Sequence, residues 1–342
     1  MKLRIAFIGT GGISRVHLQC LKMREDVEIS GLCDINPEAL EKRTKEFGGK
    51  PFSDFQQMLD EIRPDAVWIC TPTGVRYEPL IACKKRDIPV FCEKPVARTV
   101  EEGEKILDEL GDFNSHVQVG YVFRSMPVTG MVKDLIREDK IHSFLSFYCN
   151  NSGLSKRLSK WFYDKQISGG ALLDQATHNF DLLRYLLGEV EEVQGTWRNP
   201  VTQKTEGYTI EEVIAVNMVF KNGIVGTHVH TCVGDAWRNH ILLSGEKRTY
   251  WLNLNEGELK VEGESTSGIN LWETDNTNKK ARVFQQGKDK SIYHYENVVF
   301  LEMVSSQNWS KNPCTYEDGL KSLKCTLACD TAITNQQRII LQ

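Results

Sequence analysis

The sequence has no apolar run long enough to cross a membrane and no strong excess of one charge. Its 42 Lys and Arg residues nearly balance its 46 Asp and Glu residues, which leaves a net charge of -4. That balance gives no electrostatic reason to expect nucleic acid or an anionic membrane as a partner. The first apolar stretch is only one strand long and runs directly into glycines, so we expect neither a signal peptide nor a membrane segment.

The sequence also lacks any Cys-x-x-Cys pair, although it contains ten cysteines. They are scattered, and several fall in apolar stretches that we expect to be buried, such as those around Cys33, Cys70 and Cys92. This pattern is typical of reduced core thiols and predicts a cytoplasmic protein. His228 and His230 share one face of an expected strand, but no acid or cysteine partner accompanies them, so we expect no metal site.

What the chain does have is a glycine-rich turn close to its start. An apolar run breaks abruptly into Gly-Thr-Gly-Gly-Ile-Ser at residues 9–14. The run predicts a buried parallel strand, and the glycines predict a tight turn into a helix, whose first N–H groups and positive dipole end suit an anion. We therefore expect a pyrophosphate at this turn. The residues expected to hold it are Gly9, Gly11, Gly12 and Ile13.

A second expected strand, Val27 to Cys33, ends directly before Asp34. A strand-terminal acid about twenty residues after the glycine turn completes the arrangement that binds dinucleotides. The Asp34 carboxylate can accept hydrogen bonds from both ribose hydroxyls, and it would repel a 2′-phosphate. We therefore predict NAD as the cofactor, with NADP as the less favoured alternative. Ser14 stands where the arrangement usually has its third glycine, which implies slightly different packing of the helix on the strand.

Two further expected strands end in residues that suit a ligand site. The strand at residues 65–70 runs into Thr71-Pro72, and the strand at residues 89–92 runs into Glu93-Lys94-Pro95. Because parallel strands place their carboxyl ends at one edge of a sheet, these residues are expected beside the glycine turn. A lysine fixed between a strand end and a proline, next to a cofactor and an acid, can polarise a carbonyl oxygen or take part in proton transfer.

A second landmark lies at residues 169–181, Gly-Gly-Ala-Leu-Leu-Asp-Gln-Ala-Thr-His-Asn-Phe-Asp. The apolar residues from here to Gly188 recur at helical spacing. Asp174 and His178 are four residues apart, so on a helix they stack on one face, where a carboxylate fixes the imidazole tautomer and raises its basicity. The pair suits a general base that takes a hydroxyl proton near neutral pH.

The strands expected after Gly188 predict a mostly antiparallel sheet, with Asn222-Gly223 as a hairpin turn. In the strand at residues 213–220 both faces are largely apolar, so we expect the second face to meet another subunit in a homodimer or homotetramer. At 342 residues the chain is long for one core, which favours two domains. We predict an α/β Rossmann domain with a doubly wound parallel sheet at residues 1–121, and an α+β domain with a large, mostly antiparallel open sheet at residues 122–342.

Together these motifs resemble the glucose–fructose oxidoreductase, inositol dehydrogenase and rhizopine catabolism (Gfo/Idh/MocA) family. The segments that carry the resemblance are residues 9–14, Asp34, Thr71-Pro72, Glu93-Lys94-Pro95, residues 119–124 and residues 169–181. The resemblance implies an NAD-dependent oxidoreductase that moves a hydride between the nicotinamide and a secondary alcohol of a sugar, inositol or related polyol. It also implies that Thr71, Pro72, Glu93 and Lys94 line the cofactor site.

The resemblance further implies which residues act on the substrate. Lys94 would hydrogen-bond the reacting oxygen, Asp174 would orient the site, and His178 would remove the hydroxyl proton. In one respect the chain departs from the family, which often has an asparagine after Thr-Pro and a histidine a few residues later. Here these places hold Thr73 and then Arg76-Tyr77, which changes the contacts expected around the cofactor ribose.

The candidate substrate-binding residues are Tyr121, Arg124, Trp161 and Tyr163. Aromatic rings suit the apolar C–H faces of a sugar. The basic residues of the loop at 156–165, with Arg124, would suit an acidic or phosphorylated sugar; alternatively, the loop is solvated and its tryptophan packs on the fold. Two other functions use the same residues: a redox-neutral glycosidase in which NAD oxidises the sugar transiently, and a non-catalytic sensor of NAD or sugar.

Overall fold

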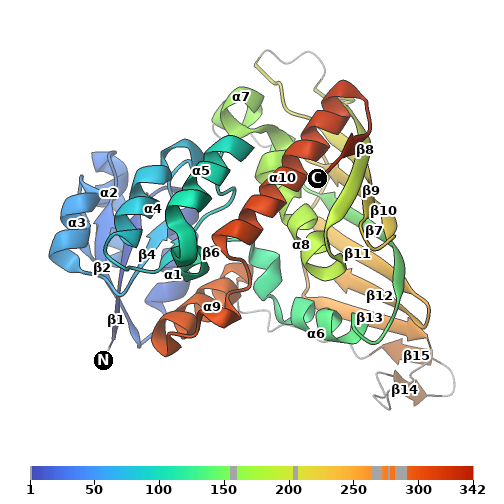
Figure 1. Cartoon of the computed structure of the whole chain (residues 1–342), viewed down its shortest axis with the longest axis horizontal. Helices are drawn as coiled ribbons and strands as arrows, with labels where there is room; N and C mark the ends of the chain where they lie inside the picture. Colours follow the sequence, from blue (N-terminus) through green and yellow to red (C-terminus); the bar gives the residue numbers. More distant parts are fainter. Residues whose placement is uncertain are drawn as a thin grey trace. The chain divides into compact units, whose positions relative to one another are not determined.

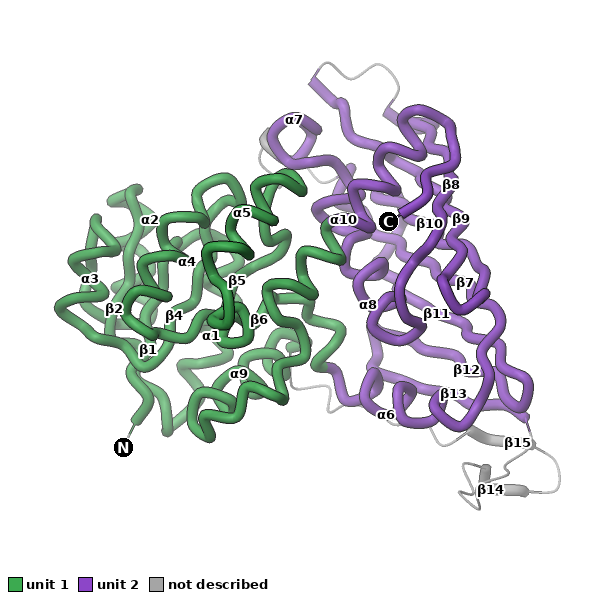
Figure 2. The backbone as a smooth tube through the Cα atoms, viewed as in Figure 1, with its two compact units in different colours: residues 1–125, 291–323 green, residues 126–290, 324–342 purple. Residues whose placement is uncertain are grey.

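The computed structural model describes residues 2–154, 160–202, 207–263, 272–275, 278–281 and 291–341. The chain forms two compact units, which Figure 2 shows in green and purple. Unit 1 contains residues 1–125 and 291–323, and unit 2 contains residues 126–290 and 324–342. The division expected from the sequence, at residue 121, therefore differs from the observed one mainly in the segment 291–323, which belongs to unit 1.

Unit 1 is built on a six-stranded parallel sheet with the strand order β3-β2-β1-β4-β5-β6 (Figure 1). The strands are β1 (Leu3–Ile8), β2 (Val27–Cys33), β3 (Lys50–Phe52), β4 (Ala66–Ile69), β5 (Val90–Cys92) and β6 (Val117–Val119). The helices are α1 (Gly12–Lys22), α2 (Pro37–Phe47), α3 (Phe55–Ile62), α4 (Tyr77–Lys84), α5 (Val100–Leu110) and α9 (Ile292–Ser306). This strand order is that of the doubly wound Rossmann sheet, so the predicted fold class of the N-terminal part is confirmed.

The sequence explains where these elements begin. The β4 strand is buried along its whole length, as central parallel strands covered on both faces must be. The α2 helix begins where the side chain of Asn36 accepts the backbone N–H groups of Glu38 and Ala39, and Pro37 occupies the first helical position. Asp54 and Thr99 cap α3 and α5 in the same way.

The apolar core explains why α9 belongs to unit 1. Phe300 is fully buried among core residues of β1, β4 and β5. Its ring lies edge-on to Trp68, with 5.1 Å between centroids, and 5.8 Å from the ring of Phe91. A helix that begins about 170 residues after the last strand of the sheet thus completes its core.

Unit 2 is built on an eight-stranded sheet with the order β13-β12-β11-β7-β10-β9-β8-β16. Its strands are β7 (Ile141–Cys149), β8 (Val190–Arg198), β9 (Val213–Phe220), β10 (Val225–Thr231), β11 (Arg238–Gly245), β12 (Arg248–Asn253), β13 (Glu258–Gly263) and β16 (Ile339–Ile340). The β7 and β10 strands run parallel and the other neighbouring pairs run antiparallel, which confirms the predicted mostly antiparallel sheet. A separate hairpin joins β14 (Trp272–Asp275) and β15 (Asn278–Ala281).

Helices cover one face of this sheet (Figure 1). They include α6 (Pro127–Ile136) and α8 (Thr177–Leu187), while α7 (Lys165–Ser168) is a short helix near the start of the second motif. The boundary between the units falls within α10 (Tyr316–Asn335). Within the described ranges, no helix combines the length and apolar character that a membrane span requires.

The packing of α9 generates a prediction about stability. We expect Phe300→Ala to lower the free energy of unfolding by about 3–5 kcal/mol, because it removes a fully buried ring and leaves a cavity. Denaturant unfolding measures this change. The matched control is Glu302→Ala on the exposed side of the same helix, with an expected change within about 0.5 kcal/mol. Equal effects of the two substitutions would mean that α9 does not complete this core.

Candidate active site

The glycine turn after β1 is fixed by close packing of two neighbouring strand ends. Gly9 has φ +91°, a conformation that side-chain-bearing residues rarely adopt. A Cβ atom at this position would lie 2.8 Å from the backbone of Cys70 and Thr71, which leave the end of β4. Gly9 therefore allows the turn after β1 to pass directly against the loop after β4, at the carboxyl edge of the sheet.

The start of α1 is open to a ligand. Its N-cap residue, Gly11, provides no side-chain hydrogen bond to the first helical N–H groups. Cβ atoms built on Gly11 and Gly12 would meet nothing within 4 Å, so no described residue beyond the turn and its helix packs against these two positions. Ser14, at the position of the usual third glycine, is buried and donates its hydroxyl to the carbonyl oxygen of Gly11 at 2.8 Å. Uncapped N–H groups beside open space fit the pyrophosphate of a dinucleotide.

Asp34 is held in place at the end of β2 by three hydrogen bonds. Its Oδ2 accepts the backbone N–H of Thr10 at 2.7 Å and the Thr10 hydroxyl at 2.9 Å. Its Oδ1 accepts the backbone N–H of Asn36 at 2.8 Å. A carboxylate has about four acceptor positions, so these bonds orient the group and leave capacity for a ribose hydroxyl.

The Glu93-Lys94 turn leaves β5 at the same edge. The Glu93 carboxyl group is buried and accepts the Lys94 backbone N–H at 3.1 Å. Its other oxygen lies 2.9 Å from His17 Nε2. Burial raises the pKa of Glu93, but the hydrogen bond from His17 and the positive charges of Lys94 and Arg76 outweigh burial and hold that pKa below its usual range. Glu93 is therefore an anion that anchors the turn from inside the protein.

The neighbours of His17 determine which of its ring nitrogens carries the proton. Asn297 accepts the indole N–H of Trp68 through Oδ1 at 2.8 Å and donates through Nδ2 to the carbonyl of Tyr293 at 2.7 Å. With the amide oriented in this way, Nδ2 also donates to His17 Nδ1 at 2.9 Å. The proton of a neutral His17 is then on Nε2, which donates to Glu93.

The sequence predicts no metal site, and one cluster of possible ligands can be compared with that prediction. Among the described residues, His17, Glu93 and Glu296 each place one possible ligand atom within 4.8 Å of the others. His17 directs an N–H at Glu93 instead of a lone pair, and burial together with the charge of Glu93 raises the pKa of Glu296 well above its usual range. The cluster is thus organised by hydrogen bonds, and its Glu296 carboxyl group resists ionisation.

In unit 2, the Gly-Gly motif begins the helix that carries Asp174 and His178. Gly169 and Gly170 both have positive φ, at +84° and +82°, and Gly169 ends α7. A Cβ on Gly170 would lie 2.7 Å from Glu211 Oε2, and this oxygen accepts the backbone N–H of Ala171 at 3.2 Å. Glu211 therefore caps the start of the helix, and glycine is needed for its close approach.

Asp174 lies in a π-helical segment, Leu172–Ala176, that leads into α8. Such segments widen one helical turn and are frequent at functional sites. Asp174 and His178 are both partly exposed, whereas Leu172 and Ala176 are buried. Asp174 and His178 thus face away from the core of the unit, whereas Thr177, Asn179 and Asp181 of the same motif are buried.

Sequence reasoning missed three polar residues beside Asp174. Asn150 donates to Gln175 Oε1 at 2.9 Å, and Gln175 donates to the hydroxyl of Ser152 at 2.7 Å. Burial and the charge of Asp174 raise the pKa of Tyr148 to about 12, so its hydroxyl stays protonated. No local signal marks Tyr148 and Asn150. They lie at and just after the end of β7, more than twenty residues before the motif in the sequence.

The candidate substrate-binding residues have varied surroundings. Tyr121 is buried, and the ring of Tyr163 stacks on that of Tyr208 with 5.4 Å between centroids. Arg124 is buried, and its guanidinium donates to Asp318 and, at 2.7 Å, to the carbonyl of Pro313. These contacts favour a structural role for Arg124. The side chain of Trp161 and residues 155–159 of the basic loop lie outside the described part of the chain.

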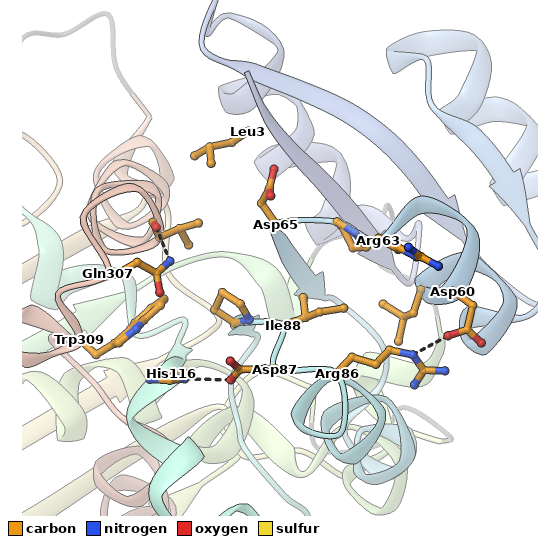
Figure 3. A pocket seen from close by; sticks show the side chains of 14 residues that line it. Leu3, Asp60, Arg63, Asp65, Arg86, Asp87, Ile88, His116, Gln307 and Trp309 are labelled. Atoms are coloured by element: carbon orange, nitrogen blue, oxygen red, sulfur yellow. Dashed lines mark hydrogen bonds and ion pairs between the residues drawn. The ribbon is translucent and has the colours of Figure 1, made fainter. Parts of the chain in front are cut away.

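Unit 1 contains a pocket of about 700 Å³ (Figure 3). Its lining includes Leu3, Asp65 and Pro89, which stand at or just before the amino ends of β1, β4 and β5. Asp60 pairs with Arg86 at 2.8 Å within the lining. The glycine turn and Glu93 lie at the opposite, carboxyl ends of the strands, so the pocket is not the cofactor site.

Comparison with known families agrees with this geometry. Residues 3–121 match the description "Oxidoreductase family, NAD-binding Rossmann fold", and residues 130–251 match "GFO/IDH/MocA C-terminal domain". The chain belongs to the GFO/IDH/MocA oxidoreductase family. The resemblance predicted from the sequence motifs is thereby confirmed, and the match assigns this oxidoreductase an N-terminal domain of the NAD-binding type.

Individual relatives share between about a fifth and a third of their aligned residues with this chain. Myo-inositol 2-dehydrogenase of Thermotoga maritima is 26% identical over 226 residues, which cover 66% of this chain and 67% of that protein. Levoglucosan dehydrogenase of Pseudarthrobacter phenanthrenivorans is 35% identical over 180 residues, which cover 48% of this chain and 45% of that protein. A solved structure of a levoglucosan dehydrogenase in complex with NADH aligns over 100% of both chains with a TM-score of 0.84 and 21% identity, which supports the fold.

The position of Asp34 generates a prediction about cofactor choice. We expect Asp34→Ser to narrow the preference for NAD over NADP by roughly tenfold or more, because it removes the charge that would repel a 2′-phosphate. Fluorescence titration with NADH and NADPH measures both dissociation constants. Asp26→Ser, at the other end of β2, is the matched control and should leave the ratio unchanged. An unchanged ratio in Asp34→Ser would show that this carboxylate does not meet the ribose.

Proposed function

We propose that the protein is an NAD-dependent dehydrogenase that oxidises a secondary alcohol of a sugar, inositol or related polyol. The observation that carries this proposal is the carboxyl edge of unit 1, where an uncapped helix start, an oriented Asp34 and the Lys94 turn follow neighbouring strands. The relatives reported above are named dehydrogenases, which favours this function over the glycosidase and sensor alternatives.

The cofactor site we propose comprises the residues at that edge: Gly9, Gly11, Gly12, Ile13, Asp34, Thr71, Pro72, Glu93 and Lys94. The N–H groups at the start of α1 would bind the pyrophosphate, and Asp34 would bind the ribose and favour NAD over NADP. When bound, NAD supplies the acceptor for a hydride.

The catalytic residues we propose are Lys94, Asp174 and His178. The Lys94 ammonium group would donate a hydrogen bond to the reacting oxygen and stabilise the negative charge that develops there. The His178 imidazole would take the hydroxyl proton, and Asp174 would orient the imidazole and the substrate. Tyr148, which senses the charge of Asp174, and the hydrogen-bonded pair Asn150 and Gln175 supply neutral donors and acceptors of the kind that sugar hydroxyls require.

We further propose that the substrate is a neutral polyol. Two of the basic residues expected to favour an acidic sugar are engaged by acids of their own unit: Arg124 pairs with Asp318, and Lys165 pairs with Glu211 at 2.5 Å and with Asp330 at 2.6 Å. Their charges are thus compensated within the protein. Tyr163 and Trp161 remain candidates for stacking against the C–H face of the sugar.

The ten cysteines are all free, which agrees with the proposed cytoplasmic location. We also propose that the outer face of the unit 2 sheet joins subunits into a homodimer or homotetramer. On this face Leu145, Phe147 and Trp251 are 58%, 38% and 46% exposed. Leu242 pairs with both Leu145 and Trp251 across β11, so the apolar row is continuous over three strands. A row of this kind is typical of an interface.

The catalytic assignment is tested by comparing two variants on the compound that the wild type oxidises fastest. Lys94→Ala should lower the rate of hydride transfer by roughly 10²–10⁴-fold while the NADH dissociation constant changes little. His178→Asn should abolish the rise of activity with pH, because the amide cannot accept the proton. Stopped-flow absorbance of the reduced nicotinamide measures both. Near-normal turnover of Lys94→Ala would show that this lysine takes no part in the reaction. It would also contradict the function proposed for the carboxyl edge of the unit 1 sheet.

The proposed interface gives a separate prediction. Leu145→Glu places a charge in the middle of the apolar row and should shift the oligomer to a smaller species, because a buried unpaired carboxylate is costly. Light scattering coupled to gel filtration measures the mass. Gln56→Glu, on an exposed face of α3, is the control and should leave the mass unchanged. If Leu145→Glu keeps the wild-type mass, this face is not the interface.

A further inference from the structure

Arg76 is a buried arginine that joins two loops of the proposed site. It directly precedes α4, and its guanidinium points at four backbone carbonyl groups. Nε and Nη2 donate to the Thr71 carbonyl at 3.2 Å and 2.9 Å, and Nη2 also donates to the Lys94 carbonyl at 3.3 Å. Nη1 donates to the carbonyls of Glu93 and Pro95.

These contacts use the whole hydrogen-bonding capacity of the side chain. A guanidinium has five N–H donors in a rigid fork, and Arg76 makes five N–H···O=C contacts. Within the described part of unit 1, none of the ion pairs involves Arg76, so carbonyl dipoles and the nearby Glu93 carboxylate balance its buried charge. Burying a charge is costly unless it is fully hydrogen-bonded, and a lysine has neither the number nor the geometry of donors for this task.

The acceptors of Arg76 come from the ends of two neighbouring strands. The Thr71 carbonyl belongs to the loop after β4, and the other three belong to consecutive residues of the Glu93-Lys94-Pro95 turn after β5. Arg76 therefore ties the two loops together at the backbone. From the other side, the buried Glu93 carboxylate holds the backbone N–H of Lys94 and is itself held by His17. Both the N–H and the carbonyl of Lys94 are thus fixed.

We propose that Arg76 is a positioning residue for Lys94. By fixing the backbone of the turn, it sets the point from which the Lys94 side chain extends, and so the place where the ammonium group meets the reacting oxygen. This inference rests on the proposed function, in which Lys94 polarises that oxygen. Arg76 reaches backbone carbonyl groups and acts on the substrate through Lys94.

The test is the variant Arg76→Lys, which keeps the charge but loses the fork. We expect kcat to fall on the order of 10²-fold, the effect of misplacing a catalytic group by about 1 Å. The NADH dissociation constant, measured by fluorescence, should stay within about threefold of wild type, since none of the five contacts of Arg76 involves the start of α1 or Asp34, which would bind the pyrophosphate and the ribose. Amide hydrogen exchange in the peptide covering residues 90–98 should become about tenfold faster, which reports the loosened turn without any turnover.

Two further variants separate positioning from general stability. Arg86→Lys changes an arginine of the same unit that pairs with Asp60 near the amino edge, and it should keep wild-type kcat and exchange. In Arg76→Ala, added guanidinium should raise kcat at least about tenfold over the value without it, whereas methylammonium, which lacks the planar fork of donors, should not raise it. A residue that only stabilised the fold would not show this selective rescue.

The outcomes distinguish this inference from the function on which it rests. If Arg76→Lys keeps the wild-type kcat and the wild-type rate of amide hydrogen exchange while Lys94→Ala transfers hydride slowly, the role of Arg76 is overturned and the proposed function stands. Loss of NADH binding in Arg76→Lys would also overturn it, because the residue would then support the cofactor site as a whole. Near-normal turnover in Lys94→Ala would instead overturn the proposed function.

Discussion

Parallel pairing of β1 with β4 and of β4 with β5 is the constraint on which the site in unit 1 depends. The ladder continues past the strands: Cys70 N–H donates to the Ile8 carbonyl at 2.8 Å, and Glu93 N–H donates to the Ile69 carbonyl at 3.1 Å. The residues that follow each strand are therefore brought to one edge in register. A larger residue at Gly9 would push the first two loops apart, since its Cβ would meet the backbone at Cys70.

The second motif is held in place by side-chain contacts instead of a backbone ladder. Asp174 and His178 lie on a helix whose start is fixed by one buried carboxylate, Glu211, through its hydrogen bond to the Ala171 backbone N–H. Lys165 and Asp330 complete this group of charges, so the helix start rests on side-chain contacts within unit 2. In unit 1 the backbone ladder fixes the residues of the proposed site, whereas in unit 2 a small ionic network fixes them.

The sequence was informative wherever the signal was local. The signals for the strand before Gly9, the Asn222-Gly223 hairpin and the Gly-Gly motif each lie within a few residues, and the structure has the corresponding elements. Asp34 was predictable because its place follows from strand length and spacing. The family resemblance then added roles for Lys94 and His178 that spacing alone does not assign.

What the sequence could not predict depends on contacts between distant residues. Helical spacing from Tyr295 to Ser306 predicts a helix but not its partner, and α9 packs on a sheet that begins almost 300 residues earlier. The pairing of Arg124 with Asp318 could not be predicted, because the two residues lie 194 positions apart. In the sequence, Arg76 is visible only as a departure from the family pattern. Its role could not be predicted, because its acceptors include backbone carbonyls of the turn after β5, which is distant in sequence.

The proposed function requires that the protein catalyse hydride transfer from a polyol to NAD. The most direct test is absorbance at the reduced-nicotinamide band while purified protein and NAD are offered inositols, aldoses, anhydrosugars, uronates, sugar phosphates and aryl glycosides. We expect the band to grow with a neutral sugar or polyol. Release of aglycone without growth of the band, or NAD binding without growth on any compound, would show that the protein is not such a dehydrogenase.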